Sequence, residues 1–155
     1  MQTSASGVAI VGPREACERF RANVLAGQVG LHGDLLAADA VIELPFAPPG
    51  RPRRFESREE FMALAGRERA AFPVRFEEFR NVVIHETADP EVIIAEYELA
   101  GTVTTTNRRA HAAFVMVLKV HDGQIVHCRE YQNVLAIAEA LGRSPALSVG
   151  PDGRS

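Results

Sequence analysis

Glu130 is the residue of this sequence best placed to carry acid–base chemistry. It lies in a segment that alternates as a β-strand does, so Cys128 and Gln132 share its face. A carboxyl group held in an apolar pocket has its charged form disfavoured, which raises its pKa toward the working pH. Such a group could move a proton next to a carbonyl or an imine. The alternative is that Glu130 pairs with a nearby arginine, Arg108 or Arg129, and only joins two strands.

His111 is the second candidate, because it opens a predicted strand beside the polar residues 107–109. It could face a ligand, or it could be an ordinary surface histidine at a strand end. The five histidines show no metal-ligand spacing, and Cys17 and Cys128 form no paired motif, so we expect neither a metal nor a disulfide. Glu43 alternates with apolar neighbours, which favours a place on the solvent or interface side of its strand.

The length and composition exclude several classes of protein. A chain of 155 residues with 46% hydrophobic residues fits one domain with a real core, and we expect it over residues 13–143, between a leader (1–12) and a tail (144–155). The net charge of -3, and the lack of a basic run flanked by aromatic residues, argue against nucleic acid as a partner. No apolar run approaches the roughly 18 residues of a membrane span. We therefore expect a soluble cytoplasmic protein.

The first half of the chain alternates helices with one strand. Apolar residues at helical spacing predict a helix over residues 13–29, and a short second helix carrying Leu31, Leu35 and Leu36 that ends near Asp39. Residues 41–46 alternate as a strand and precede a basic, proline-interrupted loop. A capping box then starts a third helix at Ser57, which should stop before Phe72.

From Val74 onward the hydrophobic period changes from helical to alternating. Strands are predicted over 74–87, 92–106, 110–120 and 125–133, followed by a terminal helix over 134–141. This order predicts an α+β fold in which a curved antiparallel sheet wraps around three to four helices. Residues 112–118 are apolar at every position, so the outer face of the sheet also needs cover, and a homodimer through that convex face is the simplest cover.

This order of elements, with the residues that carry it, resembles the nuclear transport factor 2-like superfamily in its SnoaL-like polyketide cyclase branch. The resemblance runs from about Pro13 to Gly142. Residues 39–50 look like the first strand and loop of such proteins. Residues 86–90, and residues 129–133 with 140–142 after them, resemble the phenazine-biosynthesis A/B-type subgroup. By this resemblance Glu130 matches the glutamate that serves as acid and base in that subgroup.

The resemblance implies a cone-shaped roll with a pocket between the concave sheet face and the helices, for a small apolar or aromatic metabolite and without a cofactor. One or two polar groups inside an apolar lining are typical of such pockets. Tyr97 or His111 would be hydrogen-bond partners of Glu130. The predicted lining residues are Phe20, Leu44, Phe46, Phe61, Tyr97, Phe114, Met116, Cys128 and Gln132.

Two hypotheses about function stay open at this point. The first is a cyclase- or isomerase-type enzyme that moves a proton on a cyclic or polyketide-like compound. The second is a ligand-binding or scaffold protein without catalysis. Ketosteroid isomerase, a worked case of carboxylates with shifted pKa values, uses two aspartates in its pocket. Leu44 stands at the position of the first aspartate, and Met116 or Val115 at the position of the second. Because both acids are missing, the hypothesis of a protein without catalysis stays open.

Overall fold

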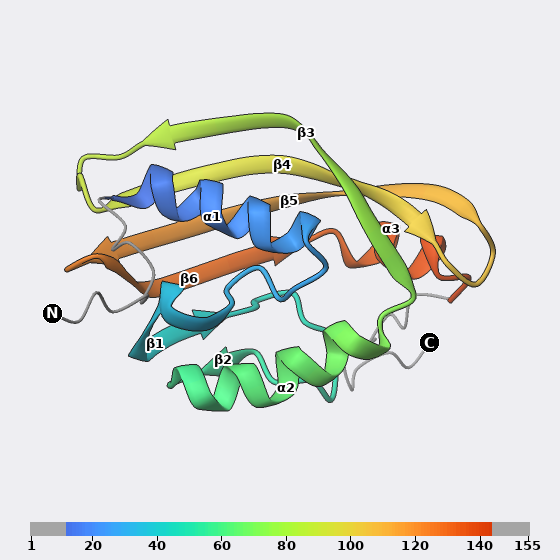
Figure 1. The fold of residues 1–155 in the computed structure, drawn as a ribbon, viewed down its shortest axis with the longest axis horizontal. Helices are drawn as coiled ribbons and strands as arrows, with labels where there is room; N and C mark the ends of the chain where they lie inside the picture. The colour runs from blue at the N-terminus through green and yellow to red at the C-terminus, as the bar shows by residue number, and fades with distance from the viewer. Residues whose placement is uncertain (1–11, 144–155) are drawn as a thin grey trace, which may run out of the picture.

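The computed structural model describes residues 12–143, in which three helices pack against one strongly bent sheet (Figure 1). The predicted leader and tail, Gly12 excepted, lie outside the described residues. The α-helices are α1 (Pro13–Leu25), α2 (Arg58–Ala71) and α3 (Val134–Ala140), and a 3₁₀ turn, η1, spans Gly33–Leu35. The strands are β1 (Leu36–Glu43), β2 (Arg54–Phe55), β3 (Val74–Glu86), β4 (Val92–Val103), β5 (Arg108–His121) and β6 (Gln124–Gln132). The α+β fold class predicted from the sequence is confirmed.

The sheet is mixed and not wholly antiparallel, which corrects one part of the prediction. Its strand order is β2-β1-β6-β5-β4-β3, and all neighbours run antiparallel except β1 and β6. The chain leaves β1, crosses through β2 and α2, and returns along four hairpin-connected strands to lie beside β1 in the same direction. This parallel pair joins the first third of the chain to its end, a contact that no local pattern reveals.

The predicted second helix is wrong, and β1 occupies most of its place. Only η1 is helical there, and it begins at Gly33, whose φ of 62° lies in the left-handed region. Leu31 and Leu35 are buried ahead of the strand, and Leu36, which is fully buried, is the first residue of β1. The strand therefore begins five residues earlier than predicted and ends at Glu43, before Pro45.

The four long strands follow the prediction closely, and the pairing of β3 with β4 is irregular. The register between β3 and β4 shifts between Arg80 and Val83, around Asn81, whose φ is 53°. A bulge of this kind bends a strand and increases its twist, and Figure 1 shows β3 turning sharply along its length. The predicted Asp122-Gly123 hairpin is confirmed by positive φ angles of 48° and 76°.

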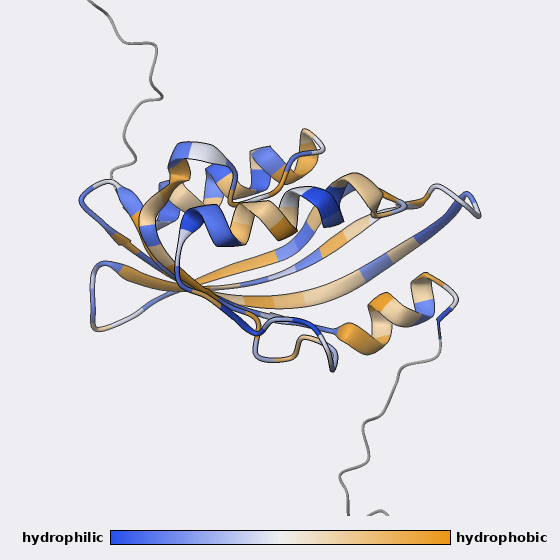
Figure 2. Cartoon of the chain, turned by 90° about the horizontal axis from the view of Figure 1, so that it is seen from below, coloured by the Kyte–Doolittle hydropathy of each residue, from blue (hydrophilic) through white to orange (hydrophobic). Residues whose placement is uncertain are grey.

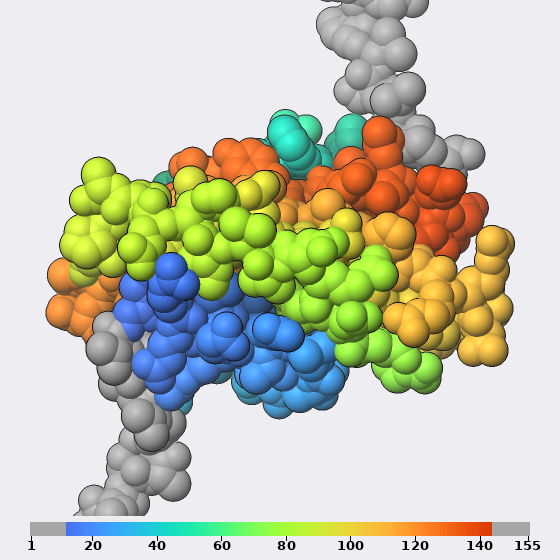
Figure 3. Space-filling model, turned by 90° about the horizontal axis from the view of Figure 1, so that it is seen from above, coloured from blue at the N-terminus to red at the C-terminus, as the bar shows by residue number. Residues whose placement is uncertain are grey.

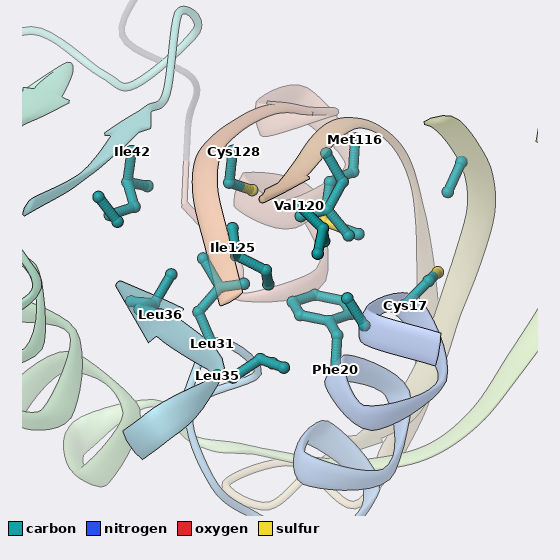
Figure 4. Close-up of a cluster of buried hydrophobic side chains, with 14 of the residues drawn as sticks. Cys17, Phe20, Leu31, Leu35, Leu36, Ile42, Met116, Val120, Ile125 and Cys128 are labelled. Carbon is teal, nitrogen blue, oxygen red and sulfur yellow. The ribbon is translucent and has the colours of Figure 1, made fainter. Parts of the chain in front are cut away.

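Helix α1 closes the concave face of the sheet. Its buried residues repeat at helical spacing, and Phe20 among them meets the rings of Phe79 and Tyr97 at centroid distances of 6.3 and 6.1 Å. Figure 4 shows Phe20 pointing from α1 into the cluster that also contains Leu35 and Ile125. In the space-filling view α1 lies along β3 and hides this core from solvent (Figure 3).

Helix α2 covers the other part of the concave side, beside β1 and β2. Its predicted capping box forms: the Ser57 hydroxyl accepts a hydrogen bond from the Glu60 amide at 3.1 Å. Phe61 packs against Phe55 of β2 at 5.4 Å between ring centroids. In Figure 2 hydrophobic and hydrophilic positions alternate along α1 and α2, and the buried ones include Phe20 of α1 and Phe61 of α2. In the described part of the chain, no helix is long and apolar enough to span a membrane.

Candidate functional site

Glu130 lies near the end of β6, on the face of the sheet that the helices cover. In the register of the sheet, Glu130 stands opposite Met116 of β5, which is fully buried. Two residues further along the same face, Gln132 stands opposite Phe114. Phe114 in turn stands opposite Tyr97 of β4. Strand alternation therefore places Glu130, Gln132 and Tyr97 on one face, as the sequence predicted for Glu130 and Gln132.

Both oxygens of the partly buried Glu130 carboxyl accept hydrogen bonds from neutral donors. The Tyr97 hydroxyl donates to Oε2 at 3.2 Å, and the Gln132 amide Nε2 donates to Oε1 at 2.7 Å. Burial raises the pKa of Glu130 above its ordinary value of 4.5, and the two hydrogen bonds oppose this rise only in part. A carboxyl group whose pKa is raised in this direction is better suited to general acid–base catalysis than an ordinary carboxyl group.

Tyr97 is the better enclosed of the two donors to the carboxyl. It is 4% exposed, and its ring stacks on Phe114 with 5.3 Å between centroids and an interplanar angle of 11°. Phe79 flanks it at 5.2 Å. Burial, and then the nearby Glu130 carboxylate, raise the pKa of Tyr97 well above 10. The hydroxyl is therefore protonated at any physiological pH and acts as a hydrogen-bond donor.

Arginine pairing does not account for Glu130. Arg129 points to the opposite face of β6, where its guanidinium donates to Glu43 at 3.3 Å. Arg108 lies at the first residue of β5, paired in register with Val103. The alternative in which Glu130 forms an arginine bridge with either residue therefore has no support in the structure.

Most of the predicted lining residues are core residues beneath the helices. Five of them are less than a tenth exposed and belong to the main hydrophobic cluster, while two more pack against that cluster from partly buried positions. The five are Phe20, Phe61, Tyr97, Met116 and Cys128, and the two are Leu44 and Phe114. Burial raises the pKa of the Cys128 thiol well above 9, so it stays neutral beside the carboxyl.

Two predicted site residues lie apart from Glu130. His111 is exposed, and its register partner Ala100 and its parity in β5 place it on the opposite sheet face from Met116. Phe46 is 58% exposed and packs edge-on against Tyr131 at 5.3 Å. The structure thus brings Tyr97 to Glu130 and does not bring His111 there, and it places Phe46 outside the concave side.

A second cluster of polar side chains, centred on Glu43, lies on the convex side of β1 and β6 and was not predicted from the sequence. Glu43 accepts hydrogen bonds from His127 at 2.6 Å and from Arg129 at 3.3 Å, and Arg54 lies 3.6 Å away. The His127 and Arg129 hydrogen bonds lower the pKa of Glu43. Its place on the outer side agrees with the sequence prediction, but its partners depend on the parallel β1–β6 pairing. Within residues 12–143, no three His, Cys, Asp or Glu side chains converge as a metal site would require.

Comparisons with known proteins identify the family of this chain. Residues 17–128 match the model of the SnoaL-like domain. An uncharacterised PhzA/B-like protein of Pseudomonas aeruginosa is 37% identical over 110 residues, which cover 70% of this chain and 75% of that protein.

Solved structures show the same fold. The crystal structure of a proposed isomerase from Bacillus subtilis superimposes with a TM-score of 0.71 at 29% identity, covering 84% of this chain and 95% of that one. A proposed polyketide cyclase of Xanthomonas campestris shares the fold with a TM-score of 0.65 at 19% identity, over 83% and 95% of the two chains. The chain belongs to the SnoaL-like family, as the residues of its first strand and last strand had indicated.

Proposed function

We propose that this protein binds a cyclic or polyketide-like metabolite and moves a proton on it without a cofactor, with Glu130 as the acid and base. The observation that carries the proposal is the Glu130 carboxyl on the concave face, held by Tyr97 and Gln132 with its pKa raised by burial. Membership of a family whose solved relatives include a proposed isomerase and a proposed polyketide cyclase is in keeping with this reaction class.

In the proposed reaction the Glu130 carboxylate takes a proton from a carbon next to a carbonyl of the ligand. The electron pair of the broken C–H bond moves onto the carbonyl oxygen and gives an enolate. In a β,γ-unsaturated ketone, protonated Glu130 then gives the proton to the γ carbon, the carbonyl re-forms and the double bond has moved. Alternatively, the enolate carbon attacks a second carbonyl of the ligand, a C–C bond closes the ring, and Glu130 gives its proton to the resulting alkoxide. The Tyr97 hydroxyl, one of the two neutral donors at the carboxyl, could stabilise the enolate oxygen.

A ligand-binding role without catalysis is the rival, and one observation favours it. Both Glu130 oxygens are already occupied by internal donors, and Leu44 and Met116 supply no second acid. A carboxyl arranged in this way could serve only to orient a bound molecule. The two functions differ in whether a bound ketone exchanges its acidic protons.

Deuterium exchange of a bicyclic ketone, 2-tetralone, in D₂O separates these functions. The wild-type protein is expected to accelerate exchange next to the carbonyl, as followed by proton NMR, and Glu130→Gln is expected to lower that acceleration by about 10²–10⁴-fold. Circular dichroism checks that the variant is folded. A wild-type protein that binds the ketone in saturation-transfer NMR but leaves its exchange at the buffer rate overturns the enzyme proposal and supports the rival.

We further propose that the protein is a homodimer through the convex face of β4, β5 and β6. Ile94 and Val117 are register partners on that face, and Val115 stands beside Tyr131 there. These side chains are only half-buried within one chain, and an apolar sheet face of this kind favours a partner. Light scattering should give twice the 16.9-kDa chain mass. Val117→Asp should give single chains, whereas Leu25→Asp, at an exposed site on α1, should remain dimeric.

A further inference from the structure

We propose that the hollow between α3 and the ends of β3, β4 and β5 receives a flat, uncharged ring of the ligand, and that α3 is a movable cover over it. This inference rests on the proposed function, because it assigns the second part of the same ligand site. The hollow lies at the end of the sheet away from the start of α1 (Figure 1).

The walls of the hollow are almost wholly apolar. Aromatic rings and aliphatic side chains from the strands form one side, and residues of α3 form the other; the principal ones are Phe76, Leu99, Phe114, Ile137 and Leu141. His111, exposed at the rim, is the one titratable side chain of the lining. A site with rings on its walls and no charge inside selects a flat, uncharged, hydrophobic ring, because a charged group there would lose its hydration without a partner.

Phe114 connects the hollow with Glu130. Its ring lines the hollow and also stacks on Tyr97, the donor to one Glu130 oxygen. On the next strand its register partner is Gln132, the donor to the other oxygen. A ligand ring that rests against Phe114 is therefore separated from the Glu130 carboxyl by the Tyr97 side chain alone, and a functional group on that ring would lie near the carboxyl. Entry of that ring would also shift the Tyr97 ring and the hydrogen bond that it makes.

The size of the hollow requires α3 to move. Its volume is about 60 Å³, whereas a cavity that takes up benzene measures roughly 150 Å³. Helix α3 has seven residues and no buried side chain, and Figure 2 shows it apart from α1 and α2. It follows Asn133, which caps it, and ends at Ala140, two residues before Gly142, whose φ is 68°. Outward displacement of α3 would leave the core between α1 and the sheet intact, so the cost of opening is small.

Probe binding with α3 variants tests this inference. The uncharged fluorophore N-phenyl-1-naphthylamine is titrated into the full chain and its fluorescence gain is measured. Ala140→Trp places an indole in the hollow and should weaken binding by tenfold or more, while Ile137→Ala enlarges the hollow and should tighten binding severalfold. Leu135→Trp is the matched control, because Leu135 lies on the same helix, is 53% exposed and does not line the hollow.

The outcomes separate this inference from the proposed function. Glu43→Gln, at a side chain on the opposite sheet face, should bind the probe as the wild type does. If ketone exchange is absent from the wild type while the α3 variants change probe affinity in opposite directions, the hollow is a ligand site and the proton transfer is wrong. If Ala140→Trp and Ile137→Ala both bind the probe with wild-type affinity, the hollow is not the site, whatever Glu130 does.

Discussion

Two glutamates on neighbouring strands, Glu130 and Glu43, occupy opposite faces of the same sheet and have opposite electrostatics. Glu130 faces the helices and receives hydrogen bonds from two neutral groups, Tyr97 and Gln132. Glu43 faces outward and is bound by His127 and by the cationic Arg129. Burial raises the pKa of the first carboxyl, and hydrogen bonds from His127 and Arg129 lower the pKa of the second.

The difference shows that the sheet face, and not the residue type, decides whether the pKa of a carboxyl is raised or lowered. Neutral donors hold a carboxylate in place without strongly favouring its charged form, whereas an arginine beside it favours that form. The charged form of Glu43, which joins β1 to β6, is therefore favoured, and in Glu130 burial favours the neutral form. Each of the following experiments breaks or sharpens this contrast.

The largest expected difference is in catalysis. In the ketone-exchange assay Glu130→Gln should lose about 10²–10⁴-fold of the acceleration, while Glu43→Gln should stay within threefold of the wild type because its side chain lies on the other face. Exchange rates under saturating ketone give the comparison. Equal losses in both variants would mean that the exchange depends on the stability of the sheet and not on a carboxyl at the site.

The next difference is in how stability depends on pH. The pKa of Glu130 is raised on folding, so the wild type should lose stability as pH rises from the ordinary value of 4.5 through the folded pKa, and the loss should stay constant above it. Glu130→Gln removes this loss and should melt higher than the wild type at pH 8, with the gap closing below pH 4.5. One kcal/mol corresponds to about 2–4 °C in melting temperature at this length.

Glu43→Gln should show the opposite sign. The pKa of Glu43 is lowered on folding, so its stabilisation is present above 4.5 and is lost as pH falls through the folded pKa. The variant should be less stable by about 0.5–1 kcal/mol at neutral pH and equal to the wild type in acid. Melting curves from pH 3 to pH 8 test both variants, and a shared sign would contradict the assignment of the two environments.

The sequence predicted the long elements and the family but not the contacts between distant segments. Alternation identified β3 to β6 because each strand keeps one face against the core, and the Asp122-Gly123 turn fixed the last hairpin. The start of β1 was predicted to be helical because Leu31, Leu35 and Leu36 fit a helical spacing over a short run. The parallel pairing of β1 with β6 has no local signal in the sequence. Because His127 and Arg129 reach Glu43 through that pairing, these partners were not predicted either.

The candidate site was predictable to the same degree. Strand alternation predicted that Glu130 and Gln132 share a face, and the family resemblance indicated Glu130 as the acid–base residue. Both predictions succeed from sequence because each depends on one short segment of the chain. His111 was linked to Glu130 only by its nearness to a polar cluster in sequence, and strand alternation places it on the other face. The hollow beneath α3 depends on where a seven-residue helix rests against three strands, and no residue pattern expresses that position.

Tyr97→Phe should sharpen the account of Glu130. The phenol is one of two donors that favour the charged carboxylate, so its removal should raise the pKa of Glu130 further and shift the acid limb of the exchange profile to higher pH. A net hydrogen bond of about 0.5–1.5 kcal/mol corresponds to a shift of up to about one pH unit. Tyr131→Phe, on the opposite face of β6, is the control and should leave the profile in place. A shift to lower pH in Tyr97→Phe would show that the phenol stabilises the neutral acid.

The smallest expected difference is in salt dependence. The Glu43 cluster is partly open to solvent, with Arg54 52% and Glu43 23% exposed in their side chains, so dissolved ions can screen it. Raising the salt from 0.1 M to 1 M shortens the screening length from about 10 Å to about 3 Å, and the stability lost in Glu43→Gln should shrink by half or more. The donors to Glu130 are neutral and enclosed, so the stability difference between Glu130→Gln and the wild type should stay the same at both salt concentrations.

Chemical denaturation with urea, which adds no ions, measures both differences. If salt reduced the Glu130→Gln difference as strongly as the Glu43→Gln difference, the Glu130 carboxyl would have to be open to bulk water, and its raised pKa would lose its physical basis.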